Sequence, residues 1–235
     1  SPNILVLLEL NEFALYKAEQ TFRKISSIPI VPFLGSVYDS ELLEDVLRDN
    51  KIQTVYHAAA YKHVPLIETN PLEGLRNNVL GTQSLVKKCI EANVSSFVLI
   101  STDKAVRPTN ILGASKRIAE MIVQNISRSF PERKLGIVRF GNVLDSSGSV
   151  VPLFRELIKK RLPITVTHPE ITRYFMTLEE ASQLVIQSSS LANGGELFLP
   201  ELQANEEKNK LYNLKLGKDI EEIQFIWGTY TRSEL

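Results

Sequence analysis

Short apolar runs alternate with amphipathic stretches of helical length from the first residues to about position 200. The apolar runs are rich in β-branched residues and nearly continuous, as is typical of strands that are buried on both faces of a parallel sheet. Their alternation with helices predicts a doubly wound α/β fold, in which helices cover both faces of the sheet. The predicted strands are Ile4–Glu9, Ile28–Phe33, Thr54–His57, Phe97–Ser101 and Gly136–Phe140.

Two long helices are predicted between these strands. Residues Pro71–Ala92 and Asn110–Ile126 both carry apolar side chains at helical spacing, and Thr109 or Asn110 can serve as the N-cap of the second helix. Residues 201–218 are rich in Glu, Asn and Lys and lose this periodicity. We therefore expect a loop or tail there.

The start of the sheet lacks an expected motif. A sheet of this type that binds a nicotinamide cofactor opens with a strand and a glycine-rich turn, yet the sequence contains no G-x-G-x-x-G or close variant. In the usual strand order, this first strand lies at the centre of the sheet. Because a sheet without its central strand is physically unfavourable, we expect either residues upstream of Ser1 or a partner chain to supply it. The sequence leaves both alternatives open.

The composition excludes several classes of function. The 235 residues, 43% of them hydrophobic, suit one α/β domain. The 27 Lys and Arg residues balance 27 Asp and Glu residues and are scattered, so a basic surface for nucleic acid is not indicated. The single cysteine, Cys89, excludes an internal disulfide framework. No apolar run of about 20 residues and no signal peptide are visible, so we expect a cytoplasmic protein without membrane contact through this chain.

The densest group of chemically active residues runs from Ser101 to Asn110, where a predicted strand ends and a predicted helix begins. Ligands of open α/β sheets bind at the carboxyl ends of the strands. Thr102, Asp103 and Lys104 bring a hydroxyl, an acid and an amine in succession to that edge. A solvated loop with an Asp–Lys ion pair is the alternative interpretation of this segment.

Five blocks of sequence carry a family resemblance when they are taken together. They are His57–Pro65, Asn78–Thr82, Ser101–Lys116, Arg139–Leu144 and Val166–Thr177. Their order and spacing resemble the polysaccharide-biosynthesis group of extended short-chain dehydrogenases/reductases, which includes inverting and retaining UDP-N-acetylglucosamine 4,6-dehydratases. The resemblance covers roughly residues 4–200, and five ordered blocks are far more specific than any one of them.

The resemblance implies a domain organisation and partners. It implies an N-terminally incomplete Rossmann-type dinucleotide-binding domain over residues 1–145, a substrate-binding region over 146–200 and a tail of uncertain structure over 201–235. It further implies a UDP-sugar substrate and a homo-oligomer. Relatives often carry an N-terminal membrane region, which would place a longer parent at the cytoplasmic face of the inner membrane.

The resemblance also implies a reaction. NAD or NADP oxidises carbon 4 of the sugar, water leaves across carbons 5 and 6, and the hydride returns to carbon 6. Lys104 is then the candidate base for the carbon 5 proton, if burial and nearby positive charge favour its neutral form. Asp103 is the candidate acid that protonates the departing hydroxyl. Thr102 is a candidate donor to the carbon 4 oxygen, with a capping hydroxyl as the alternative.

The wider superfamily pairs a catalytic Tyr with a Lys four residues later, on the same face of a helix. Lys116 matches this pattern and is expected to hold the nicotinamide ribose, whereas Leu112 replaces the Tyr and cannot exchange a proton. Lys116, Thr102 or water must then accept the proton of the carbon 4 hydroxyl. Retaining members similarly carry an aliphatic or thioether residue in place of the Tyr, although a non-catalytic protein is an alternative.

Cofactor type is predicted from Glu9, which ends the first predicted strand where such folds place an acid on the adenosine ribose hydroxyls. An acid there repels a 2′-phosphate, and no basic residue follows in Leu10–Phe13, so we expect NAD rather than NADP. Ser36 would make a weaker adenine contact than the Asp of many relatives. The further expected cofactor contacts come from the turn after the second strand and from small residues after the third, namely Ser36, Val37, Ala58, Ala59 and Ala60.

Substrate binding is expected from Lys62, His63 and Asn142, and from Arg173, which would contact the diphosphate through a charge-assisted bond. Asp145 stands where relatives commonly have Gly, and a carboxylate near a diphosphate is unfavourable unless it points away. His57 and His168 are expected to be structural, and no metal site is expected.

Three functions are weighed. The leading hypothesis is a UDP-N-acetylglucosamine 4,6-dehydratase that supplies a 4-keto-6-deoxy sugar for surface glycans. The first alternative is a nucleotide-sugar 4-epimerase, which normally depends on the Tyr that Leu112 replaces and has no need of Asp103 and Lys104. The second alternative is a non-catalytic protein that binds a nucleotide sugar or dinucleotide.

Overall fold

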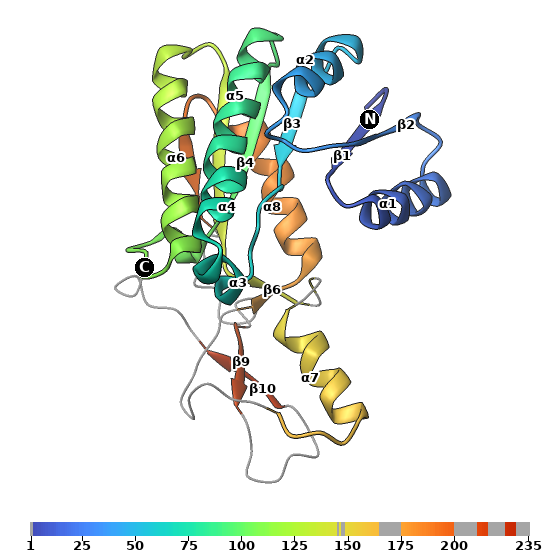
Figure 1. Cartoon of the computed structure of the whole chain (residues 1–235), viewed down its shortest axis with the longest axis vertical. Helices are drawn as coiled ribbons and strands as arrows, with labels where there is room; N and C mark the ends of the chain where they lie inside the picture. Colours follow the sequence, from blue (N-terminus) through green and yellow to red (C-terminus); the bar gives the residue numbers. More distant parts are fainter. Residues whose placement is uncertain are drawn as a thin grey trace.

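The computed structural model describes residues 2–144, 146, 149–164 and 175–199, together with the backbone of residues 211–215 and 224–228. Strands alternate with helices along most of this length (Figure 1). The strands are β1 (Leu5–Glu9), β2 (Ile30–Leu34), β3 (Thr54–His57), β4 (Ser96–Thr102), β5 (Lys134–Phe140), β6 (Asn142–Val143), β7 (Phe175–Met176), β8 (Glu196–Phe198), β9 (Leu211–Lys215) and β10 (Gln224–Gly228).

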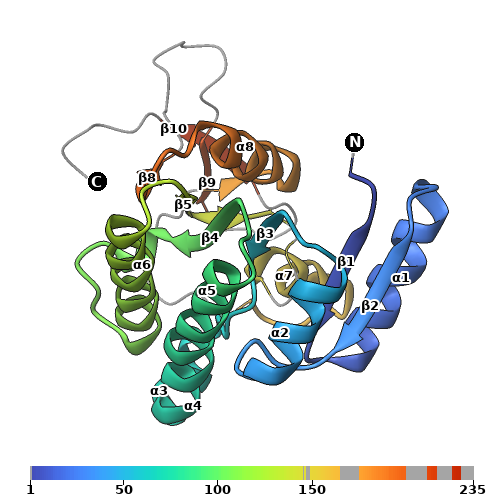
Figure 2. The ribbon, with the colours of Figure 1, turned by 90° about the horizontal axis from the view of Figure 1, so that it is seen from above.

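Helices flank the strands on both sides, as predicted for a doubly wound fold. In Figure 2, α2, α5 and α6 lie on one face of β3, β4 and β5, and α8 lies on the other face. The helix α1 packs on β1 and β2. The helices are α1 (Glu12–Ile25), α2 (Ser40–Asp49), α3 (Val64–Thr69), α4 (Pro71–Leu75), α5 (Gly81–Glu91), α6 (Ile111–Ser129), α7 (Val150–Lys159) and α8 (Leu178–Leu191).

The parallel strands form two separate groups. One has the order β2-β1 and the other the order β3-β4-β5-β8, with parallel pairing throughout. Among the described residues no strand pairs with β1 on the side away from β2, or with β3 on the side away from β4. In the usual order of a doubly wound sheet, the first strand occupies this position. The described strands leave this central position of the sheet unfilled.

The two groups of parallel strands differ in how deeply they are buried. In β4 and β5, Val98, Leu99, Ile137 and Val138 are completely buried, because helices cover both faces and strands cover both edges. Every residue from Leu5 to Leu8 of β1 is only partly buried. The core is thus centred on β4 and β5, where the residues with the proposed chemistry begin.

The predicted crossover helix Pro71–Ala92 forms, but it is not uniform. It consists of α4, a π-helical segment over Arg76–Leu80 and α5. π-Helical turns occur frequently at functional sites. Apolar periodicity does not distinguish such a turn from regular helix, so the sequence did not predict it.

The prediction of a loop over residues 201–218 was wrong in part. Residues 211–215 form β9, which pairs antiparallel with β10 over residues 224–228. The pairing partner lies outside the segment whose composition suggested a loop, and strand formation depends on such non-local pairing.

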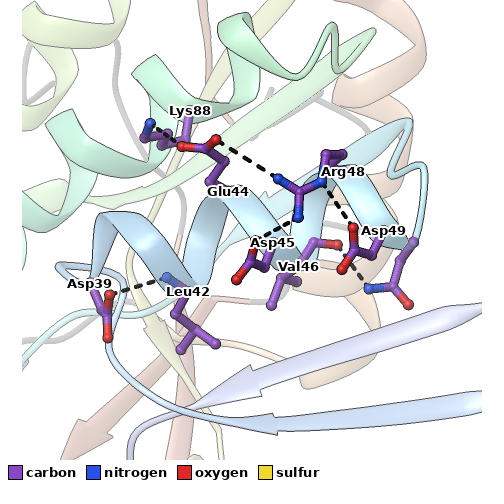
Figure 3. A network of polar contacts seen from close by, with 9 residues as sticks. Asp39, Leu42, Glu44, Asp45, Val46, Arg48, Asp49 and Lys88 are labelled. Carbon is purple, nitrogen blue, oxygen red and sulfur yellow. Dashed lines mark hydrogen bonds and ion pairs between the residues drawn. The ribbon is translucent and has the colours of Figure 1, made fainter.

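An exposed network joins α2 to α5 (Figure 3). Asp39 caps α2 by accepting a hydrogen bond from the Leu42 amide at 3.1 Å, and Lys88 Nζ of α5 lies 2.8 Å from Glu44 Oε2 of α2. Arg48 pairs with carboxylates of its own helix. Solvent screens these pairs, so they orient α2 more than they stabilise it.

No helix in the described part of the chain has the combination of length and apolar character that a membrane crossing requires.

Candidate active site

The candidate chemical groups lie at the carboxyl end of β4. Thr102 is the last residue of the strand and pairs in register with Phe140 of β5. A single 3₁₀ turn, Asp103–Ala105, follows directly. Because both strands end at the same edge, the residues after them face a common region, as the sequence analysis expected.

Thr102, Asp103 and Lys104 converge on one carboxylate oxygen. The Thr102 hydroxyl donates to Asp103 Oδ1 at 2.9 Å, and Lys104 Nζ donates to the same atom at 3.0 Å. The Thr102 oxygen also accepts a 3.4 Å hydrogen bond from the Lys104 amide, so it caps the turn as the alternative interpretation proposed. The side chains of Lys104 and Asp103 remain 35% and 42% exposed. A bound substrate would have to supply the burial that the candidate base requires.

The turn is held against the start of α6. Asn110 is the N-cap, and its Oδ1 accepts from the Gly113 amide at 2.8 Å, while Glu68 Oε1 of α3 accepts from the Ile111 amide at 2.7 Å. Gly113 sits so close to the turn that a Cβ atom would lie 2.1 Å from the Lys104 carbonyl oxygen. Glycine is therefore required at this contact, for space alone.

Lys116 lies one helical turn after Leu112 on α6. Its Nζ donates to the Ile100 carbonyl oxygen at 2.6 Å, and the residue is 5% exposed. Burial lowers the pKa of Lys116 to about 8, and the nearby Glu120 carboxylate opposes this shift. Leu112, in place of the Tyr, is also buried at 5% exposure. The helix thus presents one titratable group here instead of two.

Glu120 is a buried acid that the sequence analysis missed. The residue is completely buried, and its two oxygens accept hydrogen bonds from Ser101, from Nε and Nη2 of Arg139 and from Nη1 of Arg117. Removing one partner of such a buried pair typically costs about 3–5 kcal/mol. The only feature of the sequence that pointed to Glu120 was its position one helical turn after Lys116. A Glu at that spacing is usually a surface residue, so this feature did not predict its burial.

Asn78, in the π-helical segment, is a second residue that was not identified individually. It is 1% exposed. Its Oδ1 accepts a hydrogen bond from the Tyr61 backbone N–H at 2.8 Å. Its Nδ2 donates to the Tyr61 carbonyl oxygen and to Ser115 Oγ, each at 3.1 Å. It therefore ties the segment after β3 to the residue that precedes Lys116.

His57 is structural, as expected, at the end of β3. It is 2% exposed, and Nε2 lies 2.8 Å from Thr82 Oγ1 on α5. Its ring contacts Phe97 with centroids 6.0 Å apart.

The expected ribose-binding acid, Glu9, lies at the end of β1. One carboxylate oxygen accepts from the Asn11 amide at 2.9 Å, and the Glu9 carbonyl accepts from the Gly35 amide at 3.0 Å. The turn containing Ser36 is thereby fixed beside Glu9. The Ser36 hydroxyl oxygen accepts from the Tyr38 amide, and the side chain of Val37 is buried in the core, so only the backbone of Val37 can meet a cofactor.

The remaining expected residues follow β3 and β5. Ala58, Ala59 and Ala60 come directly after β3, and they present no side chain beyond Cβ. Lys62 and His63 follow and are exposed, although desolvation lowers the pKa of Lys62. Asn142 begins β6, which pairs with β7, and is partly buried. Arg173, Asp145 and His168 lie outside the described residues.

The described residues contain no cluster of three or more His, Cys, Asp or Glu side chains that could hold a metal ion.

Comparison with known sequences decides the family. The sequence model described as "Polysaccharide biosynthesis protein" matches residues 1–219. The chain belongs to this family. It is 48% identical to the capsular polysaccharide biosynthesis protein CapD of Staphylococcus aureus, over 86% of this chain and 34% of that protein. It is 33% identical to an inverting UDP-N-acetylglucosamine 4,6-dehydratase of Campylobacter jejuni, over 94% of this chain and 69% of that protein.

The fold comparison agrees with this assignment. The structure of Pen from Bacillus thuringiensis superposes with a TM-score of 0.79 and 34% identity, covering 85% of this chain and 61% of that chain. The chain thus has the α/β fold that was expected of an extended short-chain dehydrogenase/reductase. It spans only about a third of the length of the CapD relative.

Proposed function

We propose that the protein carrying this chain is a nucleotide-sugar 4,6-dehydratase that converts UDP-N-acetylglucosamine, or a close UDP-N-acetylhexosamine, to a UDP-4-keto-6-deoxy sugar. One observation carries the proposal: a hydroxyl, an acid and an amine meet at Asp103 Oδ1, at the carboxyl end of a central strand. A relative that is 33% identical over 94% of this chain is named as such a dehydratase, which supports the proposal.

The residues present fit a nicotinamide dinucleotide. Glu9 ends β1 and the small residues Ala58–Ala60 follow β3, the two strands that each have one edge without a partner among the described residues. Lys116 is hydrogen-bonded to the Ile100 carbonyl oxygen, near the end of β4. Glu9 would hold the adenosine ribose, and its charge favours NAD over NADP. When bound, the dinucleotide would supply the two-electron chemistry of the reaction, an oxidation at carbon 4 and a matching reduction at carbon 6.

The chain's own residues would move the protons. Thr102 donates a hydrogen bond to the carbon 4 oxygen, Lys104 takes the carbon 5 proton, and Asp103 gives a proton to the hydroxyl that leaves carbon 6 as water. When the hydride returns to carbon 6, carbon 5 must regain a proton, and Lys104 would give back the one that it took. The proton that Asp103 loses with the departing water is then balanced by the proton that the carbon 4 hydroxyl released. Lys104 Nζ and Asp103 Oδ1 are 3.0 Å apart, so both groups can serve the same sugar ring.

The proton of the carbon 4 hydroxyl needs another acceptor, because Leu112 offers none. Lys116 is the candidate acceptor. Burial lowers its pKa to about 8, so an appreciable fraction of its side chain is a neutral amine at physiological pH. The presence of Leu112 also argues against a 4-epimerase, because the chemistry of 4-epimerases normally depends on a Tyr at the position of Leu112.

Mass spectrometry of UDP-N-acetylglucosamine incubated with the purified protein and NAD tests the function. A product lighter by one water supports the dehydratase. A product of unchanged mass with inverted carbon 4 would instead identify an epimerase. The absence of any product from folded, cofactor-loaded protein would favour a non-catalytic binding protein. A cytoplasmic location and a homo-oligomeric state are further predictions.

A further inference from the structure

The buried carboxylate of Glu120 has no part in the proton transfers described above, yet every one of its hydrogen-bonding positions is used. Its Oε1 accepts from Ser101 Oγ at 2.6 Å and from Arg139 Nε at 2.7 Å. Its Oε2 accepts from Arg139 Nη2 at 2.5 Å and from Arg117 Nη1 at 3.0 Å. The Glu120 side chain has no solvent exposure and that of Arg139 has 12%.

These contacts join β5 to the two elements that carry Thr102 and Lys116, namely β4 and α6. Ser101 directly precedes Thr102 on β4, and it pairs in register with Arg139 on β5. Glu120 lies on α6 one turn after Lys116, so the two side chains share a face of the helix. A carboxylate held by four donors cannot shift without breaking several charge-assisted bonds, so it fixes α6 relative to the end of β4.

We propose that Glu120 is a positioning residue for the proposed dehydratase: it holds Lys116 and the Thr102 end of β4 in one geometry and supplies the negative charge that faces the Lys116 ammonium. The inference rests on the proposed function. It assigns to Ser101 and Arg139 the role of orienting the Glu120 carboxylate.

Charged and titratable groups come from several elements near Lys116. They are Glu120 and Arg117 on α6, His57 on β3, Arg139 on β5 and the Asp103–Lys104 pair after β4. Glu120 favours the protonated ammonium, while burial opposes it. Arg139 is neutralised by its bidentate bonds to Glu120. Loss of the Glu120 charge would therefore remove the carboxylate that favours the protonated Lys116 and leave Arg139 and Arg117 without their shared counter-ion.

The test compares Glu120→Gln and Ser101→Ala with Glu196→Gln as a matched control. Glu196 also accepts two hydrogen bonds, from the Asn193 and Gly194 amides, but it is the first residue of β8, on a different element from Lys116. For each variant, kcat, KM and the pH profile of kcat are measured per folded, cofactor-loaded molecule.

Glu120→Gln should lower kcat by about 100-fold with KM nearly unchanged, as expected when reacting groups are misplaced. Its kcat profile should also shift to lower pH. Ser101→Ala removes one of the four bonds and should lower kcat by a smaller factor, about 10-fold. Glu120→Asp should recover part of the loss, because it keeps the charge. Glu196→Gln should leave kcat and its pH profile unchanged.

A kcat and pH profile equal to those of wild type in Ser101→Ala and Glu120→Gln would overturn the proposal and leave Glu120 a purely structural residue. If Glu120→Gln fails to fold, Ser101→Ala and Arg139→Lys provide the same comparison. If the wild-type protein shows no dehydration, the proposed function fails separately. Heteronuclear NMR with isotope-labelled lysine then tests the positioning role: an unchanged Lys116 titration in Glu120→Gln would reject it.

Discussion

His57 Nε2 lies 2.8 Å from Thr82 Oγ1, and the Thr82 hydroxyl itself donates to the Asn78 carbonyl oxygen at 2.7 Å. Since Thr82 has one proton to give, it must accept from His57, which places the imidazole proton on Nε2. Burial, followed by the positive charge of Lys116, lowers the pKa of His57 to about 3. A neutral histidine therefore links β3 to α5 and to the π-helical segment.

This relationship predicts a loss of stability in acid. The pKa of His57 is about 3 in the folded protein, against an ordinary value of 6.5, so the unfolded chain binds more protons between these values. The contribution of neutral His57 is complete above pH 6.5 and is lost as the pH falls toward 3. His57→Gln, whose amide can still donate to Thr82, should reduce the slope of the unfolding free energy by about one proton in this window.

Urea denaturation at a series of pH values measures that slope. His63→Gln, at an exposed position, serves as the control and should keep the wild-type slope. An unchanged slope in His57→Gln would show that His57 does not carry the acid dependence.

Lys104→Ala should abolish dehydration and leave NAD binding intact, because the proposed base acts only after carbon 4 is oxidised. Reduced nicotinamide should accumulate in a single turnover, since the later steps are blocked. Absorbance of the reduced cofactor and mass spectrometry of the sugar follow the two halves of the reaction. Lys87→Ala, at an exposed position on α5, is the control, and sustained turnover by Lys104→Ala would remove Lys104 from the mechanism.

The rate of carbon 4 oxidation should rise with pH through about 8 and then level off, because burial lowers the pKa of Lys116 to about 8 and only the neutral amine accepts a proton. Stopped-flow measurement of cofactor reduction gives this profile. Lys116→Met should remove both the activity and the titration. A rate that is independent of pH across one unit on either side of that value would point to Thr102 or water as the acceptor.

Gly113→Ala should displace the turn that carries the candidate acid and base, because the new Cβ would lie 2.1 Å from the Lys104 carbonyl oxygen. We expect a destabilisation of about 1–3 kcal/mol, as is usual for overpacking, together with a loss of kcat. Gly194→Ala is the matched control, since its Cβ would meet only Ser127 Oγ at 3.5 Å. Thermal unfolding and turnover measured on both variants separate the local clash from a general effect of removing glycine. Wild-type activity in Gly113→Ala would show that the turn tolerates movement.

Glu9→Ala should weaken the preference for NAD over NADP by about 10- to 100-fold, or roughly 1.4–2.7 kcal/mol, because the carboxylate no longer repels a 2′-phosphate. Binding of the two dinucleotides by calorimetry gives the ratio directly. Glu12→Ala, in the first turn of α1, keeps Glu9 and should keep the preference. Equal ratios in wild type and Glu9→Ala would move the adenosine site away from β1.

Local patterns in the sequence were sufficient to predict the α/β class, the positions of strands β1 to β5 and the placement of Thr102, Asp103 and Lys104 at a strand end. Buried strands and amphipathic helices can be recognised from the pattern of apolar residues in short windows of sequence. The carboxyl ends of the parallel strands are where such folds generally bind ligands. The Asn110 cap was among the predicted alternatives for the same reason, since capping involves neighbours three residues apart.

Only the tertiary structure decided which distant groups meet. Glu120 is hydrogen-bonded to Ser101 and to Arg139, each 19 residues away in the sequence. Asn78 is hydrogen-bonded to Ser115, 37 residues away. His57 is hydrogen-bonded to Thr82, 25 residues away. No short window contains both members of such a pair, so periodicity cannot distinguish a buried, fully bonded Glu120 from a solvated one. The sequence itself therefore determines the elements and which candidate groups stand at the end of β4, while packing of β4, β5 and α6 determines the charge and orientation of the groups around them.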